Sequence, residues 1–242
     1  MEWRDEGIAL GLSRHGEGHA LLDVLTAGHG RWRGYLHGGG SRRRASLQPG
    51  DLLDLVWRAR LEDQLGSFRA ESLASPAARA LDDGEALGML SALCALCLRH
   101  LPEREPVPEI HAGALELLSA LPDPPRRRAA YALWELRLLA GIGFGPDFTR
   151  CALGGPTTDL GWVSPRSGRA ADRALGAPWA GKLLPLPVFL RDDLPEASPA
   201  DFRDALRLTG HFLALWAGRE GTGDPLPPAR LRLAARAERA AA

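Results

Sequence analysis

The change of hydrophobic pattern near Ser75-Pro76 is the feature that most limits what this chain can fold into. Before it, short segments of β-type composition are separated by Gly-rich stretches. After it, Ala and Leu recur at helical spacing, between prolines that end one helix and begin the next. The sequence therefore predicts an α+β multidomain chain, in which an N-terminal β-domain precedes an α-helical domain.

Residues 1–76 are predicted to form a small β-barrel. The candidate strands are residues 7–12, 19–26, 31–36, 52–59 and 66–72. Five short strands in so short a domain fit an OB-fold, whose strands and loops commonly bind nucleic acid or sugars. Periodicity alone leaves an SH3-like barrel open as an alternative.

The helical domain is predicted over residues 77–146 and 188–242. Its candidate helices are residues 85–101, 110–121, 129–140 and 199–218, and a last Arg/Ala segment begins near Pro228 as a helix or a frayed tail. Residues 147–187 are rich in Gly and Pro and have few periodic apolar positions, so they are predicted to form a separate insert.

The positive and negative charges balance over the whole chain, but they are unevenly distributed along the sequence. The 242 residues have a formal net charge of +0, so the whole chain has no electrostatic preference for polyanions or membranes. The window from Val24 to Gln48 nevertheless contains arginines and no Asp or Glu, and its run HGGGSRRR places three arginines beside glycines. Arginines on a Gly-rich loop can follow a phosphate backbone without reading its sequence.

We therefore predict nucleic-acid binding in this window, with a solvated basic loop as the alternative. The predicted phosphate-binding residues are Arg31, Arg33, Arg42, Arg43 and Arg44. Trp32 and Tyr35 are the candidate platforms for base stacking.

Common catalytic signatures do not occur in the sequence. Cys94 and Cys97 form a C-x-x-C motif, but it lies inside an apolar helix, where we expect buried packing rather than redox chemistry. The run GIGFG at 141–145 follows a helix, whereas a dinucleotide-binding fingerprint follows a strand. No P-loop, nucleophile elbow or H-E-x-x-H motif occurs. We therefore predict that the protein is not an enzyme and assign no catalytic residue.

The sequence also predicts a cytoplasmic protein. No apolar run approaches the roughly 20 residues that span a bilayer. The N-terminal MEWRDEGIAL lacks the basic and apolar regions of a signal peptide, and the three cysteines show no disulfide framework.

Several motifs, by their order and spacing, resemble the RecO family of bacterial DNA repair proteins, which are recombination mediators of the RecF pathway. The strongest is WELRLLAGIGFGPDFTRCA at 134–152. The others are WRDEGIAL at 3–10, HGEG at 15–18, GGGSRRR at 38–44, LQPG at 47–50, LPEREP at 101–106, VSPRSGRA at 163–170 and LLPLPVFL at 183–190.

This resemblance implies both a fold and a function. The fold is an N-terminal OB-fold, a helical domain and a late zinc-finger-like insert. The function is binding of single- and double-stranded DNA and annealing of complementary strands in DNA recombination and repair, at the nucleoid. The implied partners are RecR, the C-terminal tail of single-stranded-DNA-binding protein and, indirectly, RecA, which the mediator helps to load.

The zinc motif that the resemblance implies is incomplete in this chain. Some family members carry two C-x-x-C pairs in the insert, whose four thiolates hold zinc. Here Cys151 remains, while Gly154, Ala171 and Ala174 stand at the other three positions. We therefore expect the insert to keep its general shape with no metal and no cofactor. The candidate packing substitutes are Trp162 and Trp179.

A second candidate site would receive the partner's tail, which in the family is acidic and ends in apolar residues. Its receptor needs a basic rim around an apolar groove. Arg126, Arg127 and Arg128 precede Tyr131 and Trp134, so we predict the tail site there. The alternative is that Trp134 belongs to the core and the arginines form a solvated segment.

Our first hypothesis is thus a non-catalytic DNA-binding and strand-annealing mediator. The alternative is a protein-interaction adaptor, whose barrel contacts another protein and whose DNA affinity is incidental. An enzyme acting on a sugar or nucleotide through the barrel surface ranks last, because no nucleophile–base set or metal cluster supports it.

Overall fold

The computed structural model describes residues 1–15, 19–36, 47–61, 63–219 and 226–242. The chain forms two compact units, Met1–Ser119 and Ala120–Ala242. The first unit therefore holds helices as well as the strands before residue 76. The three-part division predicted from the sequence stays a prediction.

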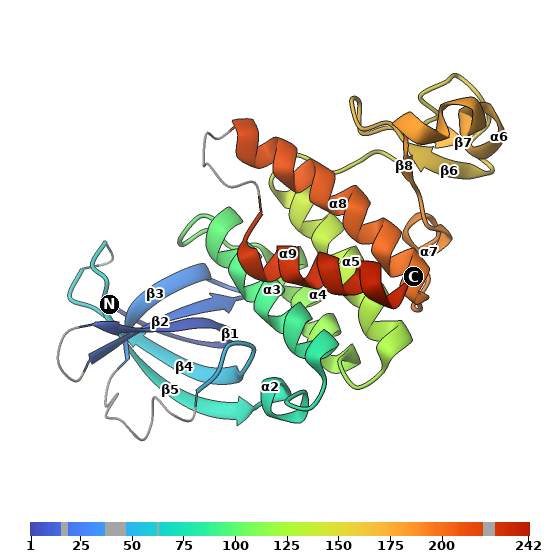
Figure 1. The fold of residues 1–242 in the computed structure, drawn as a ribbon. Coiled ribbons are helices and arrows are strands. Elements are labelled where there is room, and N and C mark those ends of the chain that lie inside the picture. Colours follow the sequence, from blue (N-terminus) through green and yellow to red (C-terminus); the bar gives the residue numbers. More distant parts are fainter. Residues whose placement is uncertain (16–18, 37–46, 62, 220–225) are drawn as a thin grey trace. The chain divides into compact units, whose positions relative to one another are not determined.

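The N-terminal unit is built on a closed barrel of five strands in the order β1-β2-β3-β5-β4 (Figure 1). The strands are β1 (Glu2–His15), β2 (His19–Thr26), β3 (Gly30–Leu36), β4 (Leu52–Arg58) and β5 (Ser67–Ala74). Neighbouring strands pair antiparallel except β3 and β5, whose parallel pairing closes the barrel. The predicted OB-type β-domain is confirmed.

Alternation of side chains explains why these segments form a barrel. In β3 and β4 every second residue is buried, as expected for strands with one face in a core and one face outward. The barrel core includes Leu22, Val24, Trp57 and Phe68, all at most 1% exposed. The indole nitrogen of Trp57 donates to the carbonyl oxygen of Leu65 at 3.1 Å, so this core tryptophan is satisfied as a donor.

Three helices follow the barrel: α2 (Pro76–Arg79), α3 (Gly84–His100) and α4 (Pro108–Ala120). The carboxylate of Asp83 caps α3 by accepting the backbone N–H groups of Glu85 and Ala86. Cys94 and Cys97 are both buried in α3, and the Cys94 thiol lies 3.7 Å from the carbonyl oxygen of Ala9 in β1. They pack, as predicted, because α3 lies against the barrel.

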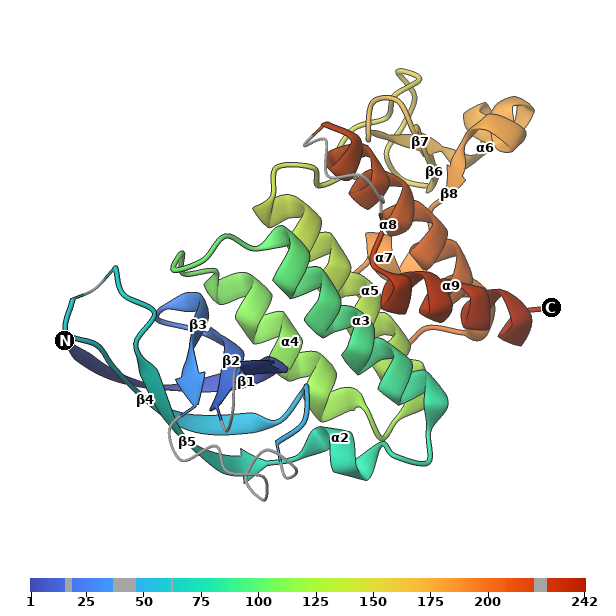
Figure 2. The same ribbon diagram turned by 60° about the vertical axis from the view of Figure 1, so that its left-hand side comes forward.

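The C-terminal unit contains the long helices α5 (Pro124–Gly141), α8 (Pro199–Arg219) and α9 (Pro228–Ala240), and the short helix α7 (Val188–Arg191). Helices α8 and α9 lie side by side (Figures 1 and 2). The Arg/Ala segment after Pro228 is therefore a helix that packs, rather than a frayed tail. None of the helices in the described ranges is long and apolar enough to cross a membrane.

The predicted insert holds its own small sheet. Its elements are β6 (Leu160–Val163), β7 (Ala170–Asp172), α6 (Arg173–Gly176), the 3-10 helix η1 (Ala177–Lys182) and β8 (Leu184–Pro185). The strand order is β7-β6-β8. The imidazole of His211 in α8 lies 3.0 Å from the carbonyl oxygen of Pro165, which attaches the insert to the helices of the same unit.

Candidate nucleic-acid interface

Strand β3 carries four of the predicted nucleic-acid-binding residues, and its alternation separates them. Trp32 points into the barrel core and is 5% exposed. Arg31, Arg33 and Tyr35 occupy the outward, half-buried positions. The side chains of these three residues therefore form the outer face of the strand, while Trp32 belongs to its interior.

Arg31 is held by the segment that follows the barrel. Its guanidinium donates to the Glu103 carboxylate at 3.2 Å and to the carbonyl oxygen of Leu98 at 3.3 Å, and the side chain is only 14% exposed. The backbone N–H of Arg104 also donates to the carbonyl oxygen of Arg31 at 2.8 Å. These contacts fasten β3 to the end of α3 and leave little of Arg31 for a phosphate.

Arg33 is paired as well, although more of it is exposed. Its guanidinium makes a two-pronged contact with the Asp23 carboxylate across the β2–β3 pair, at 2.8 and 3.1 Å. The hydrogen bond to Asp23 raises the pKa of Arg33 above its ordinary value. The acid-free window of the sequence begins at Val24, so the acid that neutralises Arg33 lies one residue before it.

Trp32 is covered by Arg104, a residue that was not predicted to belong to the site. The guanidinium of Arg104 lies over the Trp32 ring, 4.6 Å from its centroid, and donates to the carbonyl oxygen of Gln64 at 2.9 Å. On its other sides Trp32 meets Trp3 and Trp57 edge-on. In this arrangement Trp32 stabilises the barrel and has no free face for a base. Arg104 has the unusual positive φ of 67°, which no sequence pattern indicated.

Tyr35 remains accessible at the end of β3. Its ring meets the ring of His15 edge to face at 5.4 Å, and its hydroxyl lies 3.4 Å from the imidazole nitrogen Nε2 of that histidine, in an exposed contact. Arg14, beside His15 on β1, is exposed. This end of the barrel thus presents two rings on which bases can stack.

The remaining predicted residues, Arg42, Arg43 and Arg44, lie outside the described residues. Chain connectivity still restricts them, because residues 37–46 follow Leu36, the last residue of β3, and precede Leu47. Leu36 is the neighbour of Tyr35 in the chain. In the sequence, the three arginines thus follow Leu36 by six to eight residues.

Three exposed arginines of the other strands are paired with carboxylates. The pairs are Arg4–Asp54 at 2.6 Å, Arg58–Glu2 at 2.8 Å and Arg69–Glu71 at 3.3 Å. The hydrogen bond from Arg4 lowers the pKa of Asp54, and that from Arg58 lowers the pKa of Glu2. Such exposed pairs add little stability, but they leave this side of the barrel close to neutral.

The predicted tail site consists mostly of interior residues. Tyr131 and Trp134 are fully buried, and the Tyr131 hydroxyl donates to the Glu135 carboxylate at 2.7 Å. Arg127 is also buried and donates to the carbonyl oxygen of Leu121 at 2.9 Å. The aromatic pair therefore belongs to the core of the C-terminal unit and offers no groove surface. Arg126 is exposed and Arg128 half-buried, and the assignment of a partner's tail to this segment stays a prediction.

The insert does not offer a complete set of zinc ligands. Ala171 is fully buried, Gly154 is a turn residue with φ 72°, and the described residues contain no group of three or more His, Cys, Asp or Glu suited to a metal. Burial alone would raise the pKa of the Cys151 thiol. Backbone N–H groups of Asp172, Leu153 and Gly155 outweigh it and lower the pKa. The absence of a metal stays a prediction.

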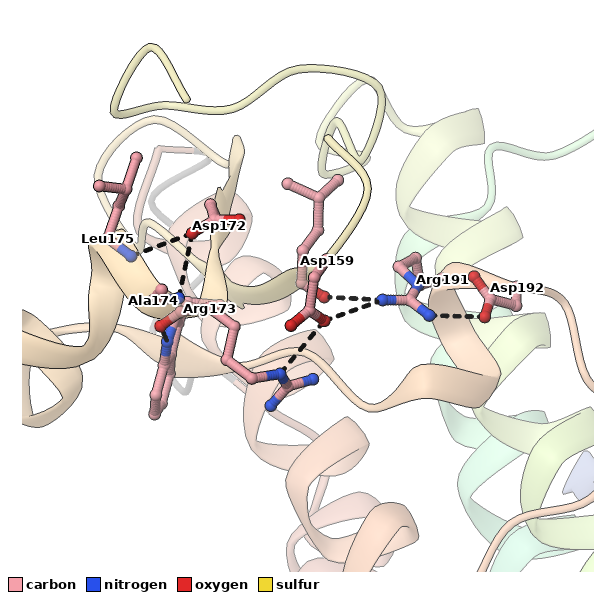
Figure 3. Close-up of polar contacts among 9 residues, drawn as sticks. Asp159, Asp172, Arg173, Ala174, Leu175, Arg191 and Asp192 are labelled. Carbon is pink, nitrogen blue, oxygen red and sulfur yellow. Dashed lines mark hydrogen bonds and ion pairs between the residues drawn. The ribbon is translucent and has the colours of Figure 1, made fainter. Parts of the chain in front are cut away.

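Polar contacts hold the insert together near Cys151. Asp172 accepts the backbone N–H groups of Ala174 and Leu175, each at 3.0 Å, and so caps α6. Arg173 and Arg191 reach the carboxylate of Asp159 from two directions, at 3.2 and 3.4 Å, which joins the start of β6 to α7 (Figure 3).

The two candidate packing tryptophans of the insert differ in their surroundings. Trp162 donates to the carbonyl oxygen of Arg173 at 3.1 Å and lies so close to Gly176 that a Cβ there would fall 2.4 Å from the indole. Trp179 is 53% exposed, with the Lys182 ammonium 5.5 Å from its ring centroid. Trp162 therefore packs within the insert, whereas the side chain of Trp179 is largely exposed to solvent.

Known proteins match both parts of this architecture. A sequence family described as "Recombination protein O N terminal" matches residues 1–76, and one described as "Recombination protein O C terminal" matches residues 81–222. The chain is 48% identical over 236 residues to the DNA repair protein RecO of a strain of Cereibacter sphaeroides, covering 96% of this chain and 97% of that protein. It is 47% identical over 222 residues to the DNA repair protein RecO of Rhodospirillum rubrum, covering 88% and 87%.

The barrel and its basic Gly-rich connection, followed by helices and a small sheet, define an OB-type barrel-and-helix protein. The family matches cover most of both units. The chain belongs to the RecO family of DNA repair proteins.

Proposed function

We propose that this protein is a DNA-binding and strand-annealing recombination mediator. One observation carries the proposal: Tyr35 and His15 form an accessible ring pair at the end of β3, while most arginines on the described barrel strands are paired with carboxylates. In the sequence, the run Arg42–Arg44 follows β3 and adds three positive charges a few residues after Tyr35. Membership of a DNA repair family supports the same conclusion.

The proposed roles follow from the contacts. Arg42, Arg43 and Arg44 bind backbone phosphates, and Tyr35 stacks on a base. Arg33 stands beside this surface and can exchange Asp23 for a phosphate, because 41% of its side chain is exposed. Arg31 and Trp32 hold the strand in place, Arg31 through Glu103 and Leu98, and Trp32 through the barrel core.

We further propose the partners that the family resemblance implies. The protein would act without catalysis on single- and double-stranded DNA in the cytoplasm, at the nucleoid. It would contact RecR and the C-terminal tail of single-stranded-DNA-binding protein, and so help to load RecA. Family membership supports these partners.

The test replaces the three loop arginines and measures the salt dependence of DNA binding. The variant R42Q/R43Q/R44Q and the wild type are titrated into a fluorescently labelled single-stranded oligonucleotide at several salt concentrations. Each lost phosphate contact on a single strand reduces the slope of log affinity against log salt by about 0.7, so the variant slope should be shallower by about 2.

The matched control is R150Q/R166Q/R169Q, which removes three exposed arginines from the insert region. It should keep the wild-type slope. An unchanged slope in the loop variant would show that the loop does not bind phosphate.

The neutral, ion-paired outer face of β1, β4 and β5 also suits a protein adaptor. On that alternative, DNA binding appears only when a partner protein such as RecR is added. The same titration with and without RecR separates the two functions.

A further inference from the structure

The outward face of α9 is a basic surface in the described part of the C-terminal unit. Arg232, Arg236 and Arg239 stand at positions i, i+4 and i+7 of this helix, and all three are exposed. Side chains at this spacing lie on one face of a helix. With a rise of 1.5 Å per residue, the first and last of them are separated by roughly 10 Å along the axis.

The opposite face of α9 is fixed to its unit by a buried network. Arg230 is fully buried, and its guanidinium donates to the Glu135 carboxylate of α5 and, at 2.9 Å, to the carbonyl oxygen of Leu206 in α8. Leu233 and Ala237 are buried one and two turns further on. The exposed arginines are therefore held on a rigid element rather than on a loose tail.

The three exposed arginines have no carboxylate partner among the described residues. Two arginines of α8, by contrast, are paired with carboxylates: Arg203 with Asp204 at 2.9 Å and Arg207 with Glu238 at 2.7 Å. Glu238 is the one acid of α9, and Arg207 of α8 occupies it. Within the part of the chain that the structure describes, no carboxylate therefore neutralises the outer face of α9.

We propose that this face of α9 is a second binding surface for the phosphate backbone of a nucleic acid. Three guanidinium groups in a row suit a chain of phosphates, because each can donate two parallel hydrogen bonds to phosphate oxygens. The alanines between them, among them Ala235, are small enough to let a backbone approach.

Two other polyanionic partners fit this face less well. Membrane-surface helices insert an apolar face into lipid, but the apolar face of α9 already packs inside its own unit. An acidic peptide with an apolar end needs a pocket for that end. The exposed face instead consists of Arg and Ala, with Leu231 at its start.

The inference rests on the proposed function and deepens it. Annealing brings two complementary strands together, and a protein that holds both needs more than one surface for phosphate. The basic run at the barrel and the outer face of α9 belong to different units of the chain. Each can therefore hold its own strand.

The test uses the full-length chain and the variant R232Q/R236Q/R239Q. The probes are a labelled oligo(dT) strand for affinity across a salt series, and two complementary labelled oligonucleotides for annealing followed by energy transfer. We expect the salt slope to become shallower by about 2 and the annealing rate to fall, with an unchanged thermal unfolding midpoint. R232K/R236K/R239K keeps the charges and should restore both the salt slope and the annealing rate.

The control R150Q/R166Q/R169Q removes the same charge from the same unit. If it lowers the slope and the annealing rate as much as the α9 variant, the effect is one of net charge and the α9 surface is wrong. If the α9 variant behaves as wild type while R42Q/R43Q/R44Q loses binding, α9 is wrong and the proposed function stands. If the wild type itself binds DNA without salt dependence, the proposed function fails.

Two further measurements identify a different partner. Sedimentation with phosphatidylserine vesicles, or titration with a labelled acidic peptide, replaces the oligonucleotide. Binding to either that is lost in R232Q/R236Q/R239Q, with DNA binding retained, would overturn the proposal.

Discussion

At the scale of single residues, the C-terminal unit depends on one buried carboxylate. Glu135 accepts hydrogen bonds from Tyr131, Thr209 and Arg230, all of them buried. A charge in such a place is tolerated only when its partners satisfy it fully. This network also decides that the segment after Pro228 is a packed helix.

Removal of the arginine partner should therefore be costly. We expect Arg230→Met to destabilise the protein by about 3–5 kcal/mol, because it leaves the Glu135 charge buried and uncompensated. Urea unfolding measures the change. Arg232→Met, on the exposed face of the same helix, should alter stability by less than about 0.5 kcal/mol. Similar losses in the two variants would contradict the assignment.

The three cysteine thiols should differ sharply in reactivity. Burial raises the pKa of Cys94 to about 12 and that of Cys97 well above its ordinary value, whereas the pKa of Cys151 is lowered. Because the thiolate is the reactive form, one thiol should react with iodoacetamide at neutral pH and two only after unfolding. Labelling should rise with pH through a midpoint below that of an ordinary thiol. Cys151→Ala should abolish this fast labelling, and fast labelling that persists would show that Cys94 or Cys97 is accessible.

At the scale of elements, strand β3 separates stability from binding by its alternation. Trp32 faces the barrel core under Arg104, and Tyr35 faces outward beside His15. Residues three apart in the sequence thus serve different purposes.

Alanine substitutions in β3 test this separation. Trp32→Ala should cost about 3 kcal/mol or more of folding free energy, as large core truncations do. Tyr35→Ala should leave the unfolding midpoint nearly unchanged and weaken single-stranded DNA binding by about 1–3 kcal/mol, the usual worth of one stacked base. Thermal unfolding and anisotropy titration give the two quantities. A reversed pattern would mean that the outward face of β3 is not part of the interface.

The elements themselves were largely predictable from the sequence, because alternation and helical periodicity are local signals. The predicted segments 19–26 and 52–59 coincide closely with β2 and β4, and the helix ends follow caps and prolines. The partners of the arginines were not predictable. Arg31 pairs with Glu103, 72 residues away, and Arg33 with Asp23 across a strand pair. Whether an arginine is free depends on such long-range pairs. The charges counted in one stretch of sequence do not show these pairs.

At the scale of the whole molecule, each compact unit carries one set of arginines that we propose to bind phosphate. In the N-terminal unit it is the sequence run Arg42–Arg44, and in the C-terminal unit it is the outer face of α9. The chain as a whole has a net charge of +0, so its attraction to polyanions is local. Binding should therefore be sensitive to these two surfaces and insensitive to other exposed arginines.

Phosphate binding by these surfaces is tested by the affinity of the wild-type protein for a labelled single strand, measured across a salt series without any partner protein. Six arginine–phosphate contacts predict a straight line of log affinity against log salt with a slope of about −4. A flat line, or no binding until a partner is added, would contradict the claim that these surfaces bind the nucleic-acid backbone.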